Sequence, residues 1–334
     1  MGNVTSHLKA WTLLALTVLA PYSAVVMGQA NISREFPSKP ISLVVPLTAG
    51  AATDTEFRLF LPRLQESIKQ PLVFDFRPGV ATTLGTAYVA RSSPDGHTLL
   101  LSNGSITLAP NFYPQLPYNV EKSFEPIIQL TERYTILMVS TVALPQVHTL
   151  QDLVSYGKEN PGILNCGTAG SGGNSHIVCA SLSSAIGVAI TPVHYKGVSQ
   201  GQPDLLAGRN HLSAGTVTVA LPFIKDGKLR PIAALNRVRS MIFPDLKTAI
   251  EVGIDVEYPT WLGVFAPAGT DQVIVDLLNR ELRAAASLAD VVNKLESQGT
   301  YVVASTPDVF RKKVSSELAR WRKIILEKNI KAEE

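Results

Sequence analysis

The sequence predicts an α/β protein with two domains, and three features lead to this prediction. Apolar runs of strand length alternate with helix-length segments over residues 41–101, in the order strand, helix, strand, helix, strand. This order is typical of a parallel sheet with right-handed crossovers. A second series of strand–loop–helix units follows, from a strand at residue 163 to a helix entered at Ser199. The chain has 334 residues, which is long enough for two domains of ordinary size.

The composition indicates a globular protein. Apolar residues make up 46% of the chain and charged residues 17%, which excludes a disordered chain. The net charge is +3, and the sequence has no basic cluster of the kind that nucleic acid requires, so no nucleic-acid partner is expected. The basic residues near the C-terminus are interpreted as the solvated face of one amphipathic helix: Arg311, Lys312, Lys313, Arg320, Arg322 and Lys323.

The N-terminus reads as a secretory signal peptide over residues 1–30. Lys9 precedes an apolar core from Trp11 to Ala20, and the small residues Gly28 and Ala30 stand at the −3 and −1 positions of a cleavage site. The apolar core is shorter than the roughly twenty residues of a membrane span. No cysteine lies near the expected cleavage after Ala30, so no lipid anchor is expected. The mature protein is therefore expected in the periplasm.

The chain has two cysteines, Cys166 at the end of a predicted strand and Cys179 in the helix that follows. Export to an oxidising compartment permits a disulfide. Two cysteines in a mature chain of this length do not form a disulfide framework, however, and two buried free thiols are the default expectation.

The first strand–loop–helix unit spans residues 41–56. Its strand, residues 41–45, is stopped by Pro46, because proline has no N–H group for the ladder. Small residues follow from Thr48 to Ala52, and Thr53-x-x-Glu56 predicts a capping box that opens a helix. Unpaired N–H groups at a helix N-terminus suit a carboxylate or a phosphate. Taken alone, this stretch is better explained as an ordinary βα turn that binds nothing.

The remaining elements of the first half follow from periodicity and turn signals. A helix is expected over residues 55–69, with Pro62 either kinking it or starting a second turn. Next come a strand (72–76), a helix (82–91), a strand (98–101) and a loop (102–105). The two runs 126–130 and 135–140 are interpreted as strands that carry the chain out of the first domain.

The second half of the chain contains further strand–loop–helix units with small-residue loops. Thr149-x-x-Asp152 predicts the cap of a helix that ends near residue 160. A strand (163–166), the long small-residue loop Gly167–Ser175 and a helix (177–186) form the second unit. A third unit comprises residues 188–190, a loop at 194–197 and a helix entered at Ser199-x-x-Gln202. A strand at 229–235 returns to the first domain, and a strand (261–266), a helix (273–285) capped by Thr270 and a final helix opened by Thr306-Pro307 complete the chain.

Two such loops that face each other across a cleft are what a hinged binding protein needs. At this point the motif order resembles the Bug-type, TctC-like solute-binding receptors of tripartite tricarboxylate transporters, from Phe36 to about Ala332. The points of resemblance occur in the right order: Phe36-Pro-x-Lys-Pro40, Thr53-Asp54, Arg77-Pro-Gly79, Pro94-Asp-Gly96, Leu116-Pro-Tyr118, Pro161-Gly162, Gly167-x-Ala-Gly170, Ser175-His176, Tyr195-Lys-Gly197, Asp204-Leu-Leu-Ala-Gly208, Gly227-Lys-Leu-Arg230 and Ala266-Pro-Ala-Gly-Thr270.

The resemblance implies a type II periplasmic-binding-protein fold, with two α/β domains, a ligand cleft and a two-strand hinge. Domain 1 is expected over residues 31–130 with 236–334, and domain 2 over 131–235. The resemblance also implies that backbone N–H groups and ordered water hold the ligand carboxylate. The implied ligand-binding residues are Thr48, Ala49, Gly50, Ala52 and Thr53 in the first loop, Thr168, Ala169, Gly170, Ser171, Asn174 and Ser175 in the second, and Lys196 and Gly197 on a third rim loop with Tyr195.

The chain departs from the family pattern at three places. Leu47 and Ala49-Gly-Ala-Ala52 replace an aromatic residue and a glycine pair. Val80 to Leu84 replaces a glycine-rich run before Gly85. Gly215, followed by Thr216, stands where many members have an aspartate, so Thr216 joins the candidate ligand-binding residues. No particular ligand is therefore transferred from the family.

Other interpretations fit the sequence less well. Gly167–Gly173 is a poor dinucleotide fingerprint, and the histidines lack metal-binding spacing, so no cofactor or metal is expected. Ser171 with a histidine would suit an exported serine hydrolase, but it lacks the nucleophile elbow. For four side chains a site role and an ordinary role stay open. His176 faces the cleft or is solvated, and Lys196 lends positive potential or is solvated. Trp261 faces the ligand or lies in the core, and Asp54 serves the ligand or its helix.

The sequence thus predicts an exported receptor, without catalytic activity, that captures a small organic carboxylate and delivers it to a membrane permease. A monomer is expected. A ligand-sensing partner of a two-component kinase is the alternative that keeps the same fold.

Overall fold

The computed structural model describes residues 36–50, 52–79, 82–113, 115–168, 170, 173–195, 198–258, 260–327 and 330. The predicted signal peptide, Ala169, Ser171, Lys196 and Gly197 lie outside these residues. The chain divides into two compact units, residues 1–36 and 37–334, and the second unit contains every element described below. Within the described residues, no helix is both long and apolar enough to cross a bilayer.

The first sheet has six strands in the order β11-β4-β10-β3-β1-β2. Strand β1 (Ile41–Val45) pairs in parallel with β2 (Leu72–Phe76) and β3 (Thr98–Asn103), which confirms the predicted parallel arrangement of the opening units. Strand β10 (Thr260–Pro267) is antiparallel to β3 and to β4 (Phe124–Arg133), and β11 (Thr300–Val302) is antiparallel to β4.

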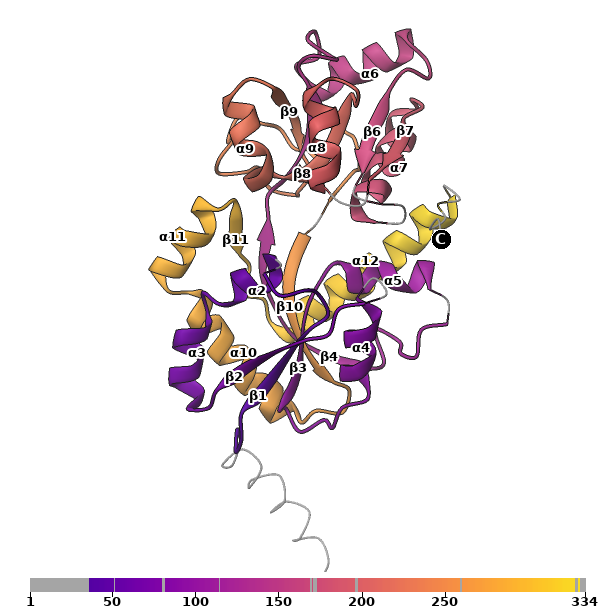
Figure 1. The fold of residues 1–334 in the computed structure, drawn as a ribbon. Helices are drawn as coiled ribbons and strands as arrows, with labels where there is room; N and C mark the ends of the chain where they lie inside the picture. Colours follow the sequence, from indigo (N-terminus) through magenta and orange to yellow (C-terminus); the bar gives the residue numbers. More distant parts are fainter. Residues whose placement is uncertain are drawn as a thin grey trace, which may run out of the picture. The chain divides into compact units, whose positions relative to one another are not determined.

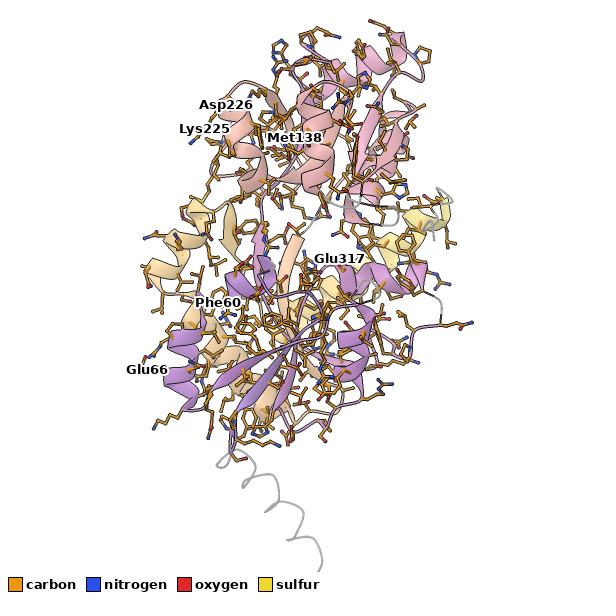
Figure 2. All side chains as sticks on the ribbon, viewed as in Figure 1. Phe60, Glu66, Met138, Lys225, Asp226 and Glu317 are labelled. Carbon is orange, nitrogen blue, oxygen red and sulfur yellow. A yellow bond between two sulfur atoms is a disulfide. The ribbon has the colours of Figure 1, made fainter. Side chains whose placement is uncertain are left out.

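The first sheet and its helices form what we call the first layer. In the described part of the chain it has seven helices: α2 (Ala52–Phe57), α3 (Leu61–Ile68), α4 (Thr83–Ala90), α5 (Ser105–Phe112), α10 (Gln272–Ala286), α11 (Ala289–Ser297) and α12 (Pro307–Glu327). Helices α4, α5 and α12 cover one face of the sheet, where Leu100, Phe265 and Phe310 form a buried cluster. Helices α3 and α10 lie side by side (Figure 1). In Figure 2, Phe60 lies inward, whereas Glu66 on α3 points to solvent.

The second sheet has five strands in the order β7-β6-β8-β5-β9. Strands β7 (Thr191–His194) and β8 (Leu212–Thr216) flank β6 (Asn165–Thr168) in parallel, and β5 (Thr135–Ser140) is antiparallel to β8 and to β9 (Leu229–Ala234). Its helices are α6 (Leu150–Glu159), α7 (Asn174–Ile186), α8 (Val198–Leu206) and α9 (Val217–Lys225), followed by the short 3-10 helix η1 (Ile250–Val252). Met138 of β5 is buried beneath residues of α8 and α9, whereas Lys225 is exposed (Figure 2).

The chain leaves the first sheet at Tyr134, between β4 and β5, and returns to it between β9 and β10. Strand β9 pairs with β5 and so belongs to the second sheet, and the return follows it. Two α/β layers joined in this way confirm the predicted fold class. The predicted domain boundaries, at 130/131 and 235/236, stay a prediction.

Several elements differ locally from the predictions. The helix expected over 55–69 is divided into α2 and α3, and Pro62 lies in the first turn of α3, where its missing N–H group costs nothing. Thr270 is not the cap of α10: the Asp271 side chain accepts a hydrogen bond from Val273 N at 2.9 Å, and Thr270 donates to Pro267 O. The capping box Thr149–Asp152 is confirmed. Strand β7 begins where residues 188–190 end, and α5, α11 and β11 were not predicted.

The expectation of free thiols is wrong. Cys166 in β6 and Cys179 in α7 form a disulfide, with their Cα atoms 6.3 Å apart. Both residues are buried in the same apolar cluster between the sheet and α7. The packing of α7 on β6 brings the two side chains together, which their spacing in the sequence does not reveal.

Candidate ligand-binding site

The first candidate loop leaves the carboxyl end of β1. Thr48, Ala49 and Gly50 are exposed, and Thr53 is buried within α2. Gly50 has φ +83°, a conformation that favours glycine, and its N–H group points at Asp54 Oδ2 at 3.4 Å. Asp54 therefore contacts the first loop from the first turn of α2.

The predicted capping box at Thr53-x-x-Glu56 is wrong. Helix α2 already begins at Ala52, and the Glu56 carboxylate instead accepts hydrogen bonds from Thr131 Oγ1 and Arg133 Nη2 on β4. Glu56 and the Arg133 guanidinium form a largely buried ion pair. This contact links α2, the helix after the first loop, to β4, the strand from which the chain leaves the first sheet.

Sequence reasoning missed the N-terminus of α4, which lies against the first loop. A Cβ atom on Gly85 would stand 2.9 Å from Pro46 Cβ, so only glycine permits this close approach. Thr82, just before α4, has φ +76°, and its buried hydroxyl lacks a partner. Asp54 Oδ1 is also buried without a hydrogen-bond partner. A buried polar atom without a partner needs an explanation, such as a bound water molecule, an ion or a ligand. The signal in the sequence was the Arg77-Pro-Gly79 turn followed by polar residues.

The second candidate loop leaves the carboxyl end of β6 and enters α7. Of its described residues, Thr168 and Ser175 are buried, and Gly170 and Asn174 are half-buried. Helix α7 starts at Asn174, and its N-cap residue, Gly173, has no side chain with which to cap it. Gly170 has φ +131°, which favours glycine. The loop therefore presents main-chain N–H groups at the positive end of a 13-residue helix.

Two histidines stand beside this loop. Strand pairing places Thr168 next to His194, and Thr168 Oγ1 lies 2.7 Å from His194 Nδ1. The His194 ring meets the His176 ring edge-on, with 4.5 Å between the centroids. His176 is 8% exposed, so it is not the solvated side chain that was one of its two predicted roles.

Hydrogen bonds between side chains hold Tyr195, the first residue of the third loop. The Tyr195 hydroxyl donates to Asp204 Oδ2 at 2.7 Å and accepts from Asn210 Nδ2 at 2.8 Å. The hydrogen bond from Tyr195, together with Arg209, holds the pKa of Asp204 below its usual value. Asn210 also lies against Gly167, where a Cβ atom would be 2.9 Å from Asn210 Nδ2.

Thr216 is the residue before α9, at the end of β8. Because β6, β7 and β8 are parallel, their carboxyl ends meet at one edge of the second sheet. The structure therefore brings Thr168, Gly170, Asn174, Ser175 and Thr216 to one sheet edge, and it places Thr48, Ala49, Gly50, Ala52 and Thr53 at the carboxyl end of β1. Carboxyl ends of strands are where open α/β sheets bind ligands.

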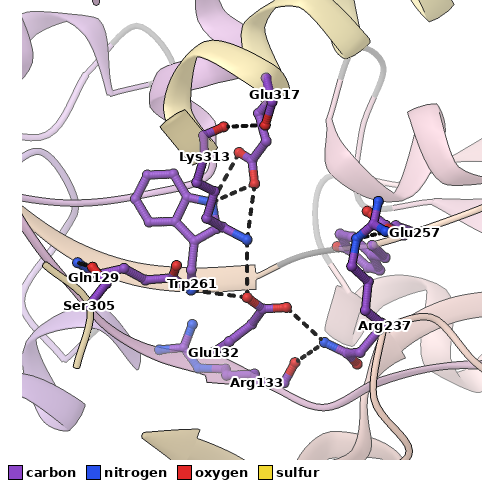
Figure 3. Close-up of polar contacts among 12 residues, drawn as sticks. Gln129, Glu132, Arg133, Arg237, Glu257, Trp261, Ser305, Lys313 and Glu317 are labelled. Carbon is purple, nitrogen blue, oxygen red and sulfur yellow. Dashed lines mark hydrogen bonds and ion pairs between the residues drawn. The ribbon is translucent and has the colours of Figure 1, made fainter. Parts of the chain in front are cut away.

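A buried polar network surrounds the point where the chain leaves the first sheet (Figure 3). Lys313 Nζ lies 3.1 Å from Glu132 and 3.5 Å from Glu317. Trp261 is fully buried, and its Nε1 donates to the Glu317 carboxylate at 3.0 Å. Trp261 is therefore a core residue, which settles the alternative left by the sequence.

This network also corrects the interpretation of the C-terminal basic residues. Lys313 pairs with Glu132 and Glu317, Arg311 with Glu125, and Arg320 with Glu257. Burial would lower the pKa of Lys313, but the Glu132 and Glu317 carboxylates raise it. Lys313 and Arg320 are therefore structural ion-pair partners, whereas Lys312, Arg322 and Lys323 are exposed, as predicted for a solvated face.

A cavity of about 690 Å³ lies elsewhere, beside α5 and α12, where Tyr118, Leu318 and Arg322 line it. It contains none of the candidate ligand-binding residues. Among the described residues, no group of three or more His, Cys, Asp or Glu side chains is arranged to hold a metal ion.

Comparison with known proteins agrees with this geometry. The profile of the tripartite tricarboxylate transporter family receptors, TctC, matches residues 57–330. The chain is 32% identical to protein BugT of Bordetella pertussis over 324 residues, which cover 95% of this chain and 98% of BugT.

Two similar solved structures come from Rhodopseudomonas palustris. Rpa4515 with adipate has a TM-score of 0.74 and 30% identity, and the match covers 89% of this chain and 100% of Rpa4515. MatC (Rpa3494) with bound malate has a TM-score of 0.70 and 30% identity, and the match covers 87% of this chain and 100% of MatC. With a family match over most of its length, two α/β layers and candidate anion-binding loops on both, the chain belongs to the TctC family of tripartite tricarboxylate transporter receptors.

Proposed function

We propose that this receptor captures a small organic carboxylate between its two candidate loops and delivers it to the permease of a tripartite tricarboxylate transporter. The observation that carries the proposal is the pair of small-residue loops, each at the carboxyl end of a parallel strand and each followed by a helix N-terminus. One loop lies on each sheet, so closure about the two connecting segments would enclose the acid and exclude water.

The similar structures support a carboxylate ligand. One of them holds adipate and another holds malate, both of which are aliphatic dicarboxylates. Main-chain N–H groups and helix dipoles can hold such anions without a cationic side chain. The alanines at positions 49, 51 and 52 make the first loop more crowded than a glycine pair would, so we propose the class of acid and not one member.

Export and the absence of catalysis belong to the same proposal. The N-terminal pattern of residues 1–30 and the disulfide both suit an oxidising compartment. The family and its solved relatives are binding proteins, which supports a receptor without catalytic activity. We also propose a monomer that works with a permease and not with a sensor kinase.

The test is a thermal-shift screen with dicarboxylates, tricarboxylates, aromatic acids and nicotinate-like compounds. We expect at least one acid to raise the melting temperature of the wild-type protein, because a ligand that binds only the folded state stabilises it. Gly170→Asp should abolish this rise, since the new carboxylate repels the ligand carboxylate from the second loop.

The matched control is Gly187→Asp, at the other end of α7. Gly187 also has a positive φ, +65°, and no atom lies within 4 Å of its Cβ direction. It introduces the same charge at another glycine of positive φ on α7, away from the loop. A Gly170→Asp protein that still responds to ligand as the wild type does would contradict the anion-loop assignment.

A further inference from the structure

We propose that the Cys166–Cys179 disulfide positions the second candidate loop, so that the receptor reaches its full affinity only when the two sulfurs are joined. The inference rests on the proposed function, because it assigns a role to the bridge in binding the carboxylate. It concerns two residues that lie outside the candidate ligand-binding set.

The bridge encloses the loop. Cys166 lies in β6 and Cys179 in the second turn of α7, 13 positions apart in the sequence. Every second-loop candidate lies between them: Thr168, Ala169, Gly170, Ser171, Asn174 and Ser175. A covalent ring therefore closes around the segment that supplies the N–H groups.

The loop needs such support because its own sequence provides little. It contains Gly167, Gly170, Gly172 and Gly173, and glycine loses more conformational freedom on ordering than any other residue. The N-cap residue of α7 is Gly173, which has no side chain with which to cap the helix. A binding loop that is held in place before the ligand arrives avoids the ordering cost at the moment of binding.

The ends of the bridge are firmly anchored. Cys166 is 0% and Cys179 1% exposed, and both pack with Leu164, Val178 and Leu182 in the core of the second sheet. The disulfide thus links the loop to the best-packed part of this layer. Because solvent does not reach the sulfurs, the bridge acts as a permanent support and not as a rapidly reversible switch.

The same ring contains the histidine contact. His176 lies between the two cysteines, and its ring meets His194 on the neighbouring strand. Holding α7 against β6 also holds His176 beside Thr168 and His194. Loss of the bridge would therefore loosen the side chains around the loop as well as its main chain.

The experiment replaces both residues, Cys166→Ala with Cys179→Ala, and measures binding of adipate and of malate by titration calorimetry and stopped flow. We expect Kd to rise about tenfold or more, mainly through faster dissociation, as is usual for changes within one binding site. Hydrogen exchange of the unliganded protein should accelerate over residues 167–178 and stay unchanged in the first sheet. The chain has no other cysteine, so no other thiol pairing confuses the result.

Leu278→Ala is the control for simple loss of stability. Leu278 is buried in α10 of the first sheet, and its truncation leaves a cavity far from the disulfide in the sequence. This variant should bind both acids with the wild-type Kd. If the double alanine variant does not fold, Cys166→Val with Cys179→Ala, which restores apolar volume in β6, is measured instead.

The outcomes separate the two proposals. Unchanged Kd and unchanged exchange over 167–178 in the double variant would overturn the role of the bridge. If neither acid nor any compound of the screen binds the wild-type protein, the carboxylate proposal fails by itself, and the exchange measurement still decides whether the disulfide positions the loop.

Discussion

At the residue scale, Glu317 shows how one buried carboxylate is accommodated. It is 6% exposed, and it accepts hydrogen bonds from Trp261 Nε1 and Thr107 Oγ1 while Lys313 lies 3.5 Å away. Burial raises its pKa, and the Lys313 ammonium group opposes this shift only in part. The side chain is therefore needed more as an acceptor of hydrogen bonds than as a charge.

These hydrogen bonds to Glu317 predict that two substitutions lower the free energy of unfolding by different amounts. Glu317→Gln keeps an acceptor for Trp261 and should lower the free energy of unfolding by less than about 1 kcal/mol, whereas Glu317→Leu leaves the indole N–H group unpaired and should cost about 2 kcal/mol. Urea denaturation measures both. In a Trp261→Phe background, which has no such donor, the cost of Glu317→Leu should shrink, and an unchanged cost would show that the hydrogen bond is unimportant.

The raised pKa also predicts a pH dependence. The folded protein retains the Glu317 proton at pH values where the unfolded chain, with an ordinary pKa near 4.5, has released it. Stability is therefore lost as pH rises from that value through the folded pKa. The Glu317→Gln protein should lack this part of the slope, so its stability relative to the wild type should improve with pH in that window.

At the element scale, the side-chain amide of Asn236 links the two segments that connect the sheets. Asn236 is 3% exposed, and its Oδ1 accepts from Thr135 N at 2.7 Å while its Nδ2 donates to Arg133 O at 3.0 Å and to Glu132 at 3.2 Å. Leu235 N also donates to Thr135 O. The outgoing and returning segments are thus held together beside the network of Lys313.

Asn236→Ala should lower the free energy of unfolding by about 2 kcal/mol, because Thr135 N is left buried without an acceptor. It should also change the Kd for adipate, since closure about these segments is part of binding in the proposed mechanism. Chemical denaturation and calorimetry measure the two effects.

Asn279→Ala is the matched control. Asn279 is 7% exposed, and its amide donates to Ile127 O and Ser305 O within the first layer. Its loss should destabilise the protein to a similar degree without altering the Kd. Equal effects of both variants on adipate binding would argue against a special role of the connecting segments.

At the scale of the whole molecule, the N-terminal pattern predicts a processed protein. Expressed in a Gram-negative host, the chain should reach the periplasm and begin at Asn31, as intact mass and N-terminal sequencing would show. Ala30→Leu places a large side chain at the −1 position and should leave the precursor uncleaved. A wild-type protein that keeps residues 1–30 would contradict the signal-peptide assignment.

The sequence by itself determined the features that depend on neighbouring residues. Apolar runs followed by small residues located β1 and its loop, and the Thr149–Asp152 capping box and the start of α12 were found in the same way, because strand length, turn residues and caps act over a few positions. The order of these units also predicted the two layers and the two candidate loops.

Only the tertiary structure decided the contacts between distant segments. It joined Cys166 to Cys179, turned Glu56 from a capping residue into the partner of Arg133, and paired Lys313 with Glu132 of β4. Each of these outcomes depends on how a helix packs on a strand that is paired elsewhere in the chain. A side chain's partner is then set by three-dimensional proximity, and spacing along the sequence carries no signal for it.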